Sequence, residues 1–308
     1  MRENPANRYV CCIGAMTVLR ILTLQVAGNR ATSNPVTTRH RHGGVAHNVA
    51  RYLARLPVSC KLLTMVGDDA EGRALVMATS QQDVDIGLVQ KSLSLPTATC
   101  TTVLQPDGEL FASFADMEIC ASMDRGFIQN RWIQISHAAL VFVDANLPAD
   151  TLAYLIAGCR EHELTLVVDA VSNLTTGKLP LNLHGVDMLI SNIDEASVIL
   201  GNETAEDPEA LATALCQRGA ASTVITGGAG GICFADAGGA VTLPTEGEPG
   251  DAIGDSDAFI AGTLYGRLMK YDPVTSLCIG RKAAAIIAGS AEPHGAGLSA
   301  AAITAGIE

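Results

Sequence analysis

Residues 251–262 combine a glycine turn with a carboxylate at the expected beginning of a helix. They read DAIGDSDAFIAG, and the helix is predicted to begin near Asp257, after a turn built on Gly254. The first turn of a helix has backbone N–H groups without intrahelical partners, and these can hold an anion. A carboxylate beside them can accept a proton. Together they would serve a hydroxyl that attacks a phosphoryl group, with Asp257 as general base and Gly254 in the anion hole.

Two residues of this stretch do not suit such a site. Asp255 and Ser256 lie between Gly254 and Asp257. A second carboxylate about 4 Å from the transferring phosphoryl group would cost roughly 4 kcal/mol at an effective dielectric constant near 20. A positive φ at Ser256 would add about 1–2 kcal/mol. Asp255 could instead face away or cap the helix, and the sequence leaves both arrangements open.

Two polar segments farther along the chain allow both a functional and a structural interpretation. Asn192 and Glu195 carry the oxygen ligands that suit Mg²⁺, but their spacing is also that of a helix capping box. Thr226, Gly228 and Gly231 belong to a glycine-rich stretch that could approach phosphates through its backbone. The same stretch could be a hairpin turn, because a strand pattern rather than a helix follows it.

Near the N-terminus, residues 42–50 (HGGVAHNVA) place two glycines before a predicted helix. Asn48 can both donate and accept hydrogen bonds, which suits a sugar diol. Gly43 and Gly44 would then let the backbone approach the ligand. A turn into a helix with a structural Asn explains the same residues.

The elements that must position these residues alternate between short apolar runs and helical patterns. Such alternation predicts an α/β fold, with a mainly parallel sheet covered by helices on both faces. The expected strands are 10–13, 62–66, 139–143, 164–169, 188–192 and 222–226, and the expected helices are 45–55, 72–79, 148–160, 194–200 and 208–218, with further helices from Phe259 onward. The apolar run 9–19 is predicted to be a buried first strand.

Two segments, about 22–41 and 97–115, alternate apolar and polar residues instead. They are predicted to form a small, half-exposed sheet inserted in one domain of residues 1–308. Such a sheet would act as a lid at the carboxyl end of the strands, where α/β proteins bind ligands.

These motifs, taken in order along almost the whole chain, resemble the ribokinase-like (PfkB) family of carbohydrate and nucleoside kinases. Residues 42–50, 66–72 (VGDDAEG), 191–195 (SNIDE), 226–231 (TGGAGG) and 251–259 are similar to its successive signatures. Within the family, Ser33-Asn34-Pro35, residues 116–119 (DMEI) and residues 169–172 (DAVS) resemble the pseudouridine kinases. The resemblance implies a three-layer sandwich with a small β lid.

The resemblance also implies roles for the residues. Asp257 would be the catalytic base and Gly254 part of the anion hole. Gly43, Gly44, Asn48, Thr17 and Asp116 would bind the substrate. That substrate would be a sugar or nucleoside with a primary hydroxyl as acceptor, and the resemblance favours the 5′-hydroxyl of pseudouridine. Asn192, Thr226, Gly228, Gly231 and Asp251 would contact ATP, and Asn192 and Glu195 would hold Mg²⁺. The family also often uses K⁺ near the positions matching Asp251 and Ile253.

The chain departs from the family pattern at several of these positions. The family usually has Ala and Gly where this chain has Asp255 and Ser256, and an Asn and an Asp where it has Thr17 and Leu19. Leu19 cannot accept a hydrogen bond from a sugar hydroxyl, and such a lost contact costs about 1–3 kcal/mol. Two hypotheses therefore remain at this point: an active kinase, or an impaired relative that binds a nucleoside or nucleotide as a sensor or scaffold.

Composition and charge limit the classes of binding partner that we expect for this protein. The 308 residues include 48% hydrophobic ones and carry a formal net charge of −12, which argues against nucleic-acid polymers as partners. Neither a signal-peptide pattern nor an 18-residue apolar span is evident, and the nine Cys are scattered without metal-binding or disulfide spacing. We therefore expect a cytoplasmic protein with reduced thiols that acts on a small molecule. A homodimer through the lid strands is the assembly that these features allow.

Overall fold

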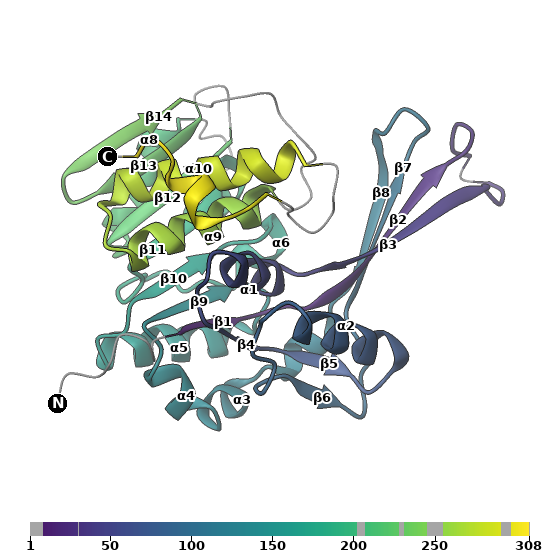
Figure 1. The fold of residues 1–308 in the computed structure, drawn as a ribbon, viewed down its shortest axis with the longest axis horizontal. Coiled ribbons are helices and arrows are strands. Elements are labelled where there is room, and N and C mark those ends of the chain that lie inside the picture. The colour runs from purple at the N-terminus through teal and green to yellow at the C-terminus, as the bar shows by residue number, and fades with distance from the viewer. Residues whose placement is uncertain are drawn as a thin grey trace.

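An eight-stranded sheet forms the centre of the protein (Figure 1). The computed structural model describes residues 9–29, 31–201, 207–227, 231–244, 255–290 and 297–307. The strand order is β14-β13-β12-β11-β10-β9-β1-β4, and the strands from β4 to β12 pair in parallel, whereas β13 and β14 are antiparallel. Their bounds are β1 Val10–Ile13, β4 Cys60–Leu63, β9 Leu140–Asp144, β10 Leu166–Asp169, β11 Met188–Asn192, β12 Ser222–Thr226, β13 Ile232–Asp236 and β14 Gly239–Leu243.

Helices cover both faces of this sheet. Because side chains alternate along a strand, Val10 and Cys12 belong to one apolar core and Cys11 and Ile13 to the other. The Val10 core is covered by α1 (Val45–Arg55), α2 (Ala70–Ser80), α9 (Asp255–Leu268), α10 (Pro273–Ala288) and α11 (Ala300–Thr304). The Cys11 core is covered by α3 (Arg125–Gln129), α4 (Trp132–Ser136), α5 (Ala149–Glu161), α7 (Ile193–Leu200) and α8 (Pro208–Gln217). The short α6 (Asn173–Thr176) follows β10. The predicted α/β sandwich is confirmed.

A separate four-stranded sheet projects from the body of the molecule (Figure 1). Its order is β3-β2-β7-β8, formed by β2 (Thr17–Leu24), β3 (Val36–Gly43), β7 (Thr99–Leu104) and β8 (Leu110–Asp116). This is the predicted lid sheet, but its first strand begins at Thr17 rather than near residue 22. A third, two-stranded sheet joins β5 (Met65–Gly67) to β6 (Gln90–Ser92).

The apolar run 9–19 is not one strand, as predicted, but parts of two. The chain turns at Gly14, whose φ is 150°. A Cβ there would lie 2.2 Å from the Asp144 carboxylate, so the position requires glycine. The next N–H, that of Ala15, donates to Asp144 Oδ2 at 2.8 Å. The run therefore leaves the main sheet at residue 14 and enters the lid at Thr17.

Most other elements lie within two residues of their predicted bounds. The expected strand 62–66 is an exception, because it is split between β4 and β5. The nine cysteines are free thiols, as their scattered spacing predicts. Among the helices of the described segments, none has the length and apolar character needed to cross a bilayer.

Candidate active site

Helix α9 begins at Asp255, two residues before the predicted start. Acidic residues near the positive end of the helix dipole favour this earlier beginning. Ser256 is helical and has no positive φ, so the backbone strain considered from the sequence does not arise. Gly254, Asp251 and the side chain of Asp255 lie outside the described part of the chain. The roles predicted for Gly254 and Asp251 remain predictions, and so do both arrangements considered for Asp255.

Asp257 is a buried carboxylate rather than an exposed first-turn acid. Its exposed fraction is 7%, and Asn48 Nδ2 of α1 donates to its Oδ2 at 2.8 Å. Burial raises the pKa of Asp257 to about 7, and the Asp144 carboxylate adds to this effect, whereas the Asn48 hydrogen bond and Arg51 oppose it. A carboxyl group with this pKa can accept a proton near neutral pH and release it again.

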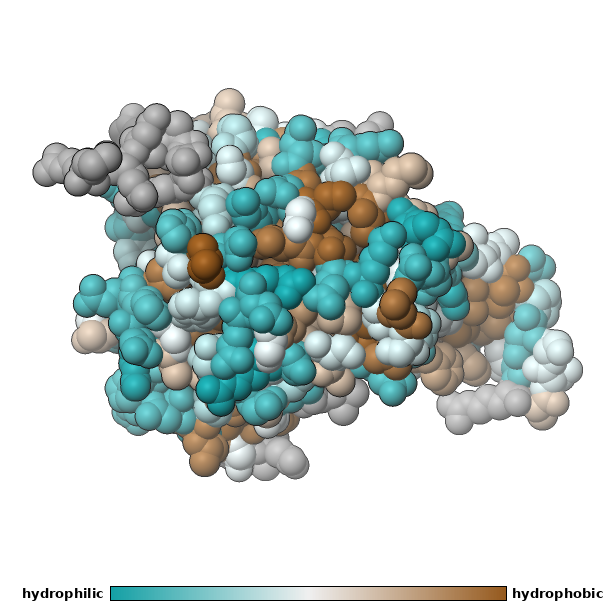
Figure 2. Space-filling model, turned by 90° about the horizontal axis from the view of Figure 1, so that it is seen from below, coloured by the Kyte–Doolittle hydropathy of each residue, from teal (hydrophilic) through white to brown (hydrophobic). Residues whose placement is uncertain are grey.

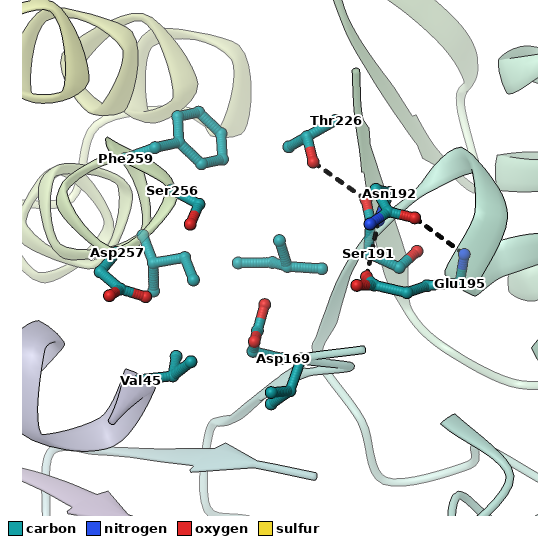
Figure 3. A pocket seen from close by; sticks show the side chains of 12 residues that line it. Val45, Asp169, Ser191, Asn192, Glu195, Thr226, Ser256, Asp257 and Phe259 are labelled. Atoms are coloured by element: carbon teal, nitrogen blue, oxygen red, sulfur yellow. Dashed lines mark hydrogen bonds between the residues drawn. The ribbon is translucent and has the colours of Figure 1, made fainter. Parts of the chain in front are cut away.

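Asp257 lies at one side of a cleft of about 170 Å³ at the carboxyl ends of the strands (Figure 3). Ser256 and Asp257 of α9 lie on one side, and Asn192, Glu195 and Thr226 lie on the other. The complete lining is Val45, Asp169, Val171, Ile190, Ser191, Asn192, Glu195, Thr226, Ser256, Asp257, Phe259 and Ile260. The structure thus brings together three predicted sites, at Asn192/Glu195, Thr226 and Asp257, that are about 30 residues apart along the chain.

Asn192 and Glu195 form the capping box that the sequence allowed. Asn192 Oδ1 accepts the N–H of Glu195 at 2.8 Å, and Glu195 Oε2 accepts the N–H of Asn192 at 2.9 Å. Burial raises the pKa of Glu195, although the Asn192 N–H opposes that shift. The capping box holds both side chains at the cleft. Its structural role is therefore compatible with a role of these residues in the site.

The glycine-rich stretch after β12 joins two antiparallel strands, as its hairpin interpretation predicted. Thr226 ends β12, and β13 begins at Ile232. Gly231, with a φ of 102°, precedes β13 directly. Thr226 lines the cleft, and its hydroxyl donates to the Ser191 carbonyl at 3.4 Å. Gly228 lies outside the described residues.

Asp169 is a cleft residue that was not predicted as part of the site. It ends β10, is 9% exposed, and lies between the two sides of the cleft (Figure 3). Burial raises its pKa well above the usual range, and the carboxylates of Glu195, Asp257 and Asp144 add to the shift. Val171, two residues on, has a φ of 70°, which is strained for a β-branched residue. The sequence signal that could have identified Asp169 is a single carboxylate at the end of a buried apolar strand.

The predicted substrate residues lie where the lid meets α1. Gly44, with a φ of 97°, precedes α1, and a Cβ there would lie 2.3 Å from the Ala15 carbonyl oxygen. Thr17 is paired with Gly43 in the lid sheet. Leu19 is on the same lid strand, two residues farther along. Asp116 ends β8, is exposed, and accepts the N–H of Glu118 at 3.4 Å; it does not line the cleft.

Fold and site together define an α/β sandwich with a buried acid at a helix N-terminus and a β lid. The family description "pfkB family carbohydrate kinase" matches residues 7–298. The chain therefore belongs to the PfkB family, and it is a sugar or nucleoside kinase.

One curated relative is a kinase of this kind, and two solved structures share the fold. The chain is 28% identical to a pseudouridine kinase of Escherichia coli over 275 residues, which cover 85% of this chain and 83% of that protein. A carbohydrate kinase from Agrobacterium tumefaciens has a TM-score of 0.83 at 24% identity, covering 97% and 96% of the two chains. The ribokinase of Arabidopsis thaliana, solved with ribose and ATP, has a TM-score of 0.75 at 16% identity, covering 93% and 94%.

Proposed function

We propose that this kinase transfers the γ-phosphoryl group of ATP to the 5′-hydroxyl of pseudouridine. The observation that carries the proposal of catalysis is the buried Asp257 carboxylate at the N-terminus of α9, with its pKa raised to about 7. The choice of pseudouridine is supported by the similarity to the pseudouridine kinase of Escherichia coli.

In this proposal Asp257 accepts the proton of the acceptor hydroxyl as that oxygen attacks phosphorus. The first N–H groups of α9 lack intrahelical partners and face the developing negative charge. Asn48, which is hydrogen-bonded to Asp257, lies on α1, which begins directly after Gly44 at the N-cap, so acceptor and base are held by neighbouring elements. Thr226 and Asn192 would contact the nucleotide from the opposite side of the cleft.

The residues of the cleft fit Mg²⁺, because Asn192 and Glu195 carry oxygen atoms of the kind that would hold this ion. Within the described segments, no three His, Cys, Asp or Glu side chains form a metal cluster of their own. Mg²⁺ usually keeps several waters and binds one or two carboxylates together with substrate phosphates. We assign Glu195 as that carboxylate, directly or through water, with Asn192 orienting it through the capping box. When bound, the ion neutralises phosphate charge. The use of K⁺ near Asp251 remains a prediction.

Glu195→Gln separates the metal role from the capping role. The amide oxygen of Gln can still accept the Asn192 N–H, so we expect the unfolding midpoint to change little. The lost negative charge should raise the Mg²⁺ concentration needed for half-maximal activity by about tenfold or more, equivalent to about 1.4 kcal/mol. Magnesium titrations of both proteins at saturating ATP measure this. An unchanged magnesium requirement would show that Glu195 caps the helix but does not hold the metal.

The acceptor is tested by ADP release with Mg·ATP and a panel of pseudouridine, uridine, adenosine, ribose and fructose. We expect the largest kcat/KM with pseudouridine. Turnover of another acceptor in preference to pseudouridine would support the kinase activity but reject pseudouridine as the substrate. No turnover of any acceptor, with Mg·ATP still raising the unfolding midpoint, would favour the impaired relative that the residues Asp255, Ser256 and Leu19 suggested.

We also infer that two copies pair through the lid. In Figure 2 the lid, at the right, presents apolar surface. Leu110 and Phe114 of β8 are 65% and 64% exposed. The strand register places Phe114 on the same lid face as Val103 and Leu22. Sedimentation equilibrium should therefore find a dimer, and a monomer at high micromolar concentration would reject this inference.

A further inference from the structure

Helix α1 presents two polar side chains toward the base of the proposed reaction. Asn48 Nδ2 donates to Asp257 Oδ2 at 2.8 Å, and Arg51 Nη1 donates to Asn48 Oδ1 at 3.3 Å. Asn48 and Arg51 are three residues apart and therefore lie on the same face of the helix. Arg51 and Asp257 are only 6% and 7% exposed, so the three groups form a largely buried line.

The chemistry of the three groups fixes the orientation of the Asn48 amide. An ionised carboxylate only accepts hydrogen bonds, and a guanidinium only donates them. Only one orientation of the amide satisfies both neighbours, with its NH₂ toward Asp257 and its oxygen toward Arg51. Without Arg51 the Asn48 oxygen would lose this partner, and the amide would be held on one side, by Asp257, instead of on two.

The positive charge of Arg51, like its hydrogen bond to Asn48, favours the ionised form of Asp257. Burying a guanidinium is costly unless it is hydrogen-bonded and close to an opposite charge. Arg51 lowers the pKa of Asp257, and Asp257 in turn raises that of Arg51, whose largest shift is a lowering by burial. Two other carboxylates face this region, Asp144 at the end of β9 and Asp169 at the end of β10. At Asp257 the Asp144 carboxylate raises the pKa, and Arg51 opposes that effect.

We propose that Arg51 is a positioning residue for catalysis: through Asn48 it holds the Asp257 carboxylate in its ionised, correctly oriented state. This inference rests on the proposed function only for its effect on rate. The line Arg51–Asn48–Asp257 can also be tested without turnover.

The first test compares Arg51→Met with wild type and with Arg55→Gln. Met keeps the apolar stem of Arg51 and removes its charge and donors, whereas Arg55, one turn farther along α1, is exposed. We expect the acid limb of kcat/KM against pH to move up by about one pH unit in Arg51→Met, so activity at pH 6 falls about tenfold more than at pH 9. Arg55→Gln should leave the acid limb at its wild-type pH. Arg51→Lys, which keeps the positive charge, should show a smaller shift than Arg51→Met.

The second test measures the titration of Asp257 directly. Carboxyl ¹³C resonances of aspartate-labelled protein are followed against pH, with Asp257→Asn identifying the signal. The midpoint should rise in Arg51→Met and not in Arg55→Gln. An equal loss of rate at all pH values, with an unmoved midpoint in folded Arg51→Met and Arg51→Lys, would overturn the proposal. A moved midpoint in a protein that turns over no acceptor would reject the proposed function and retain the coupling.

Discussion

Replacing Asp257 by Asn is expected to lower kcat by about 10²–10⁴-fold, the usual contribution of a positioned general base. The amide has nearly the same shape but cannot accept the proton of the attacking hydroxyl. The KM for ATP should change little, because the nucleotide would be held by the opposite side of the cleft. Initial rates with saturating Mg·ATP and acceptor give kcat. Asp272→Asn is the matched control, since Asp272 is an exposed cap of the next helix, α10, and does not line the cleft.

The pKa of Asp257 adds a pH signature to this prediction. The base must be ionised, so wild-type kcat/KM should rise about tenfold per pH unit below pH 7 and level off above it. A carboxyl group whose pKa is raised by folding binds its proton more tightly in the folded state, so stability falls as the pH rises toward 7. Asp257→Asn removes this loss, and its unfolding midpoint should exceed that of wild type at pH 8 and approach it at pH 4. A variant that keeps wild-type kcat would exclude Asp257 as the base.

The fold was largely predictable from the sequence because its signals are local. Buried parallel strands are short apolar runs, and the helices between them have clear turns and caps, as at Pro208 and Asn192. The division of residues 9–19 was not predictable. It depends on Asp144, which lies about 130 residues away and binds the Ala15 N–H. Strand pairing and a distant hydrogen bond, rather than local propensity, decide where β1 ends.

The site was predictable where a motif and its structural role coincide. Asn192 and Glu195 were found through a spacing that also makes a capping box, and the structure shows that cap at the cleft. Asp169 and Arg51 were not predicted as site residues, although Asp169 begins the segment 169–172 and Arg51 directly follows the segment 42–50. Their importance comes from burial near other charges, and only the fold brings those charges together.

Asp144→Asn is expected to destabilise the protein by about 3–6 kcal/mol, because two charge-assisted hydrogen bonds of about 1.5–3 kcal/mol each are lost. Asp144 is fully buried. Its Oδ2 accepts the N–H groups of Ala15 and Ala46 at 2.8 and 3.1 Å. Its Oδ1 accepts the backbone N–H and the side-chain amide of Asn146 at 3.1 and 2.9 Å. An Asn side chain must turn its NH₂ toward one of these pairs of donors, whichever way it is oriented.

The expected fall in unfolding midpoint is roughly 10 °C for a chain of this size. Asp150→Asn, the same change at an exposed position in the first turn of α5, should lower it by no more than about 1–2 °C. Calorimetry at pH 8 measures both. An equal, small effect of the two substitutions would show that Asp144 is not the support of this region.

Asp144→Asn should also impair catalysis in the fraction of the protein that remains folded. Asp144 ties the turn at Gly14 to the beginning of α1, because the Ala15 and Ala46 N–H groups share its Oδ2. The proposed acceptor residues are next to these two points of attachment, because Thr17 follows Ala15 and Gly44 precedes Ala46 by two residues each. A displacement of about 1 Å in a reacting group can cost roughly 10²-fold in rate. Asp144→Asn should therefore raise the KM for the acceptor and lower kcat at 15 °C, well below unfolding, while the KM for ATP changes less, since Asn192 and Thr226 belong to other strands of the sheet.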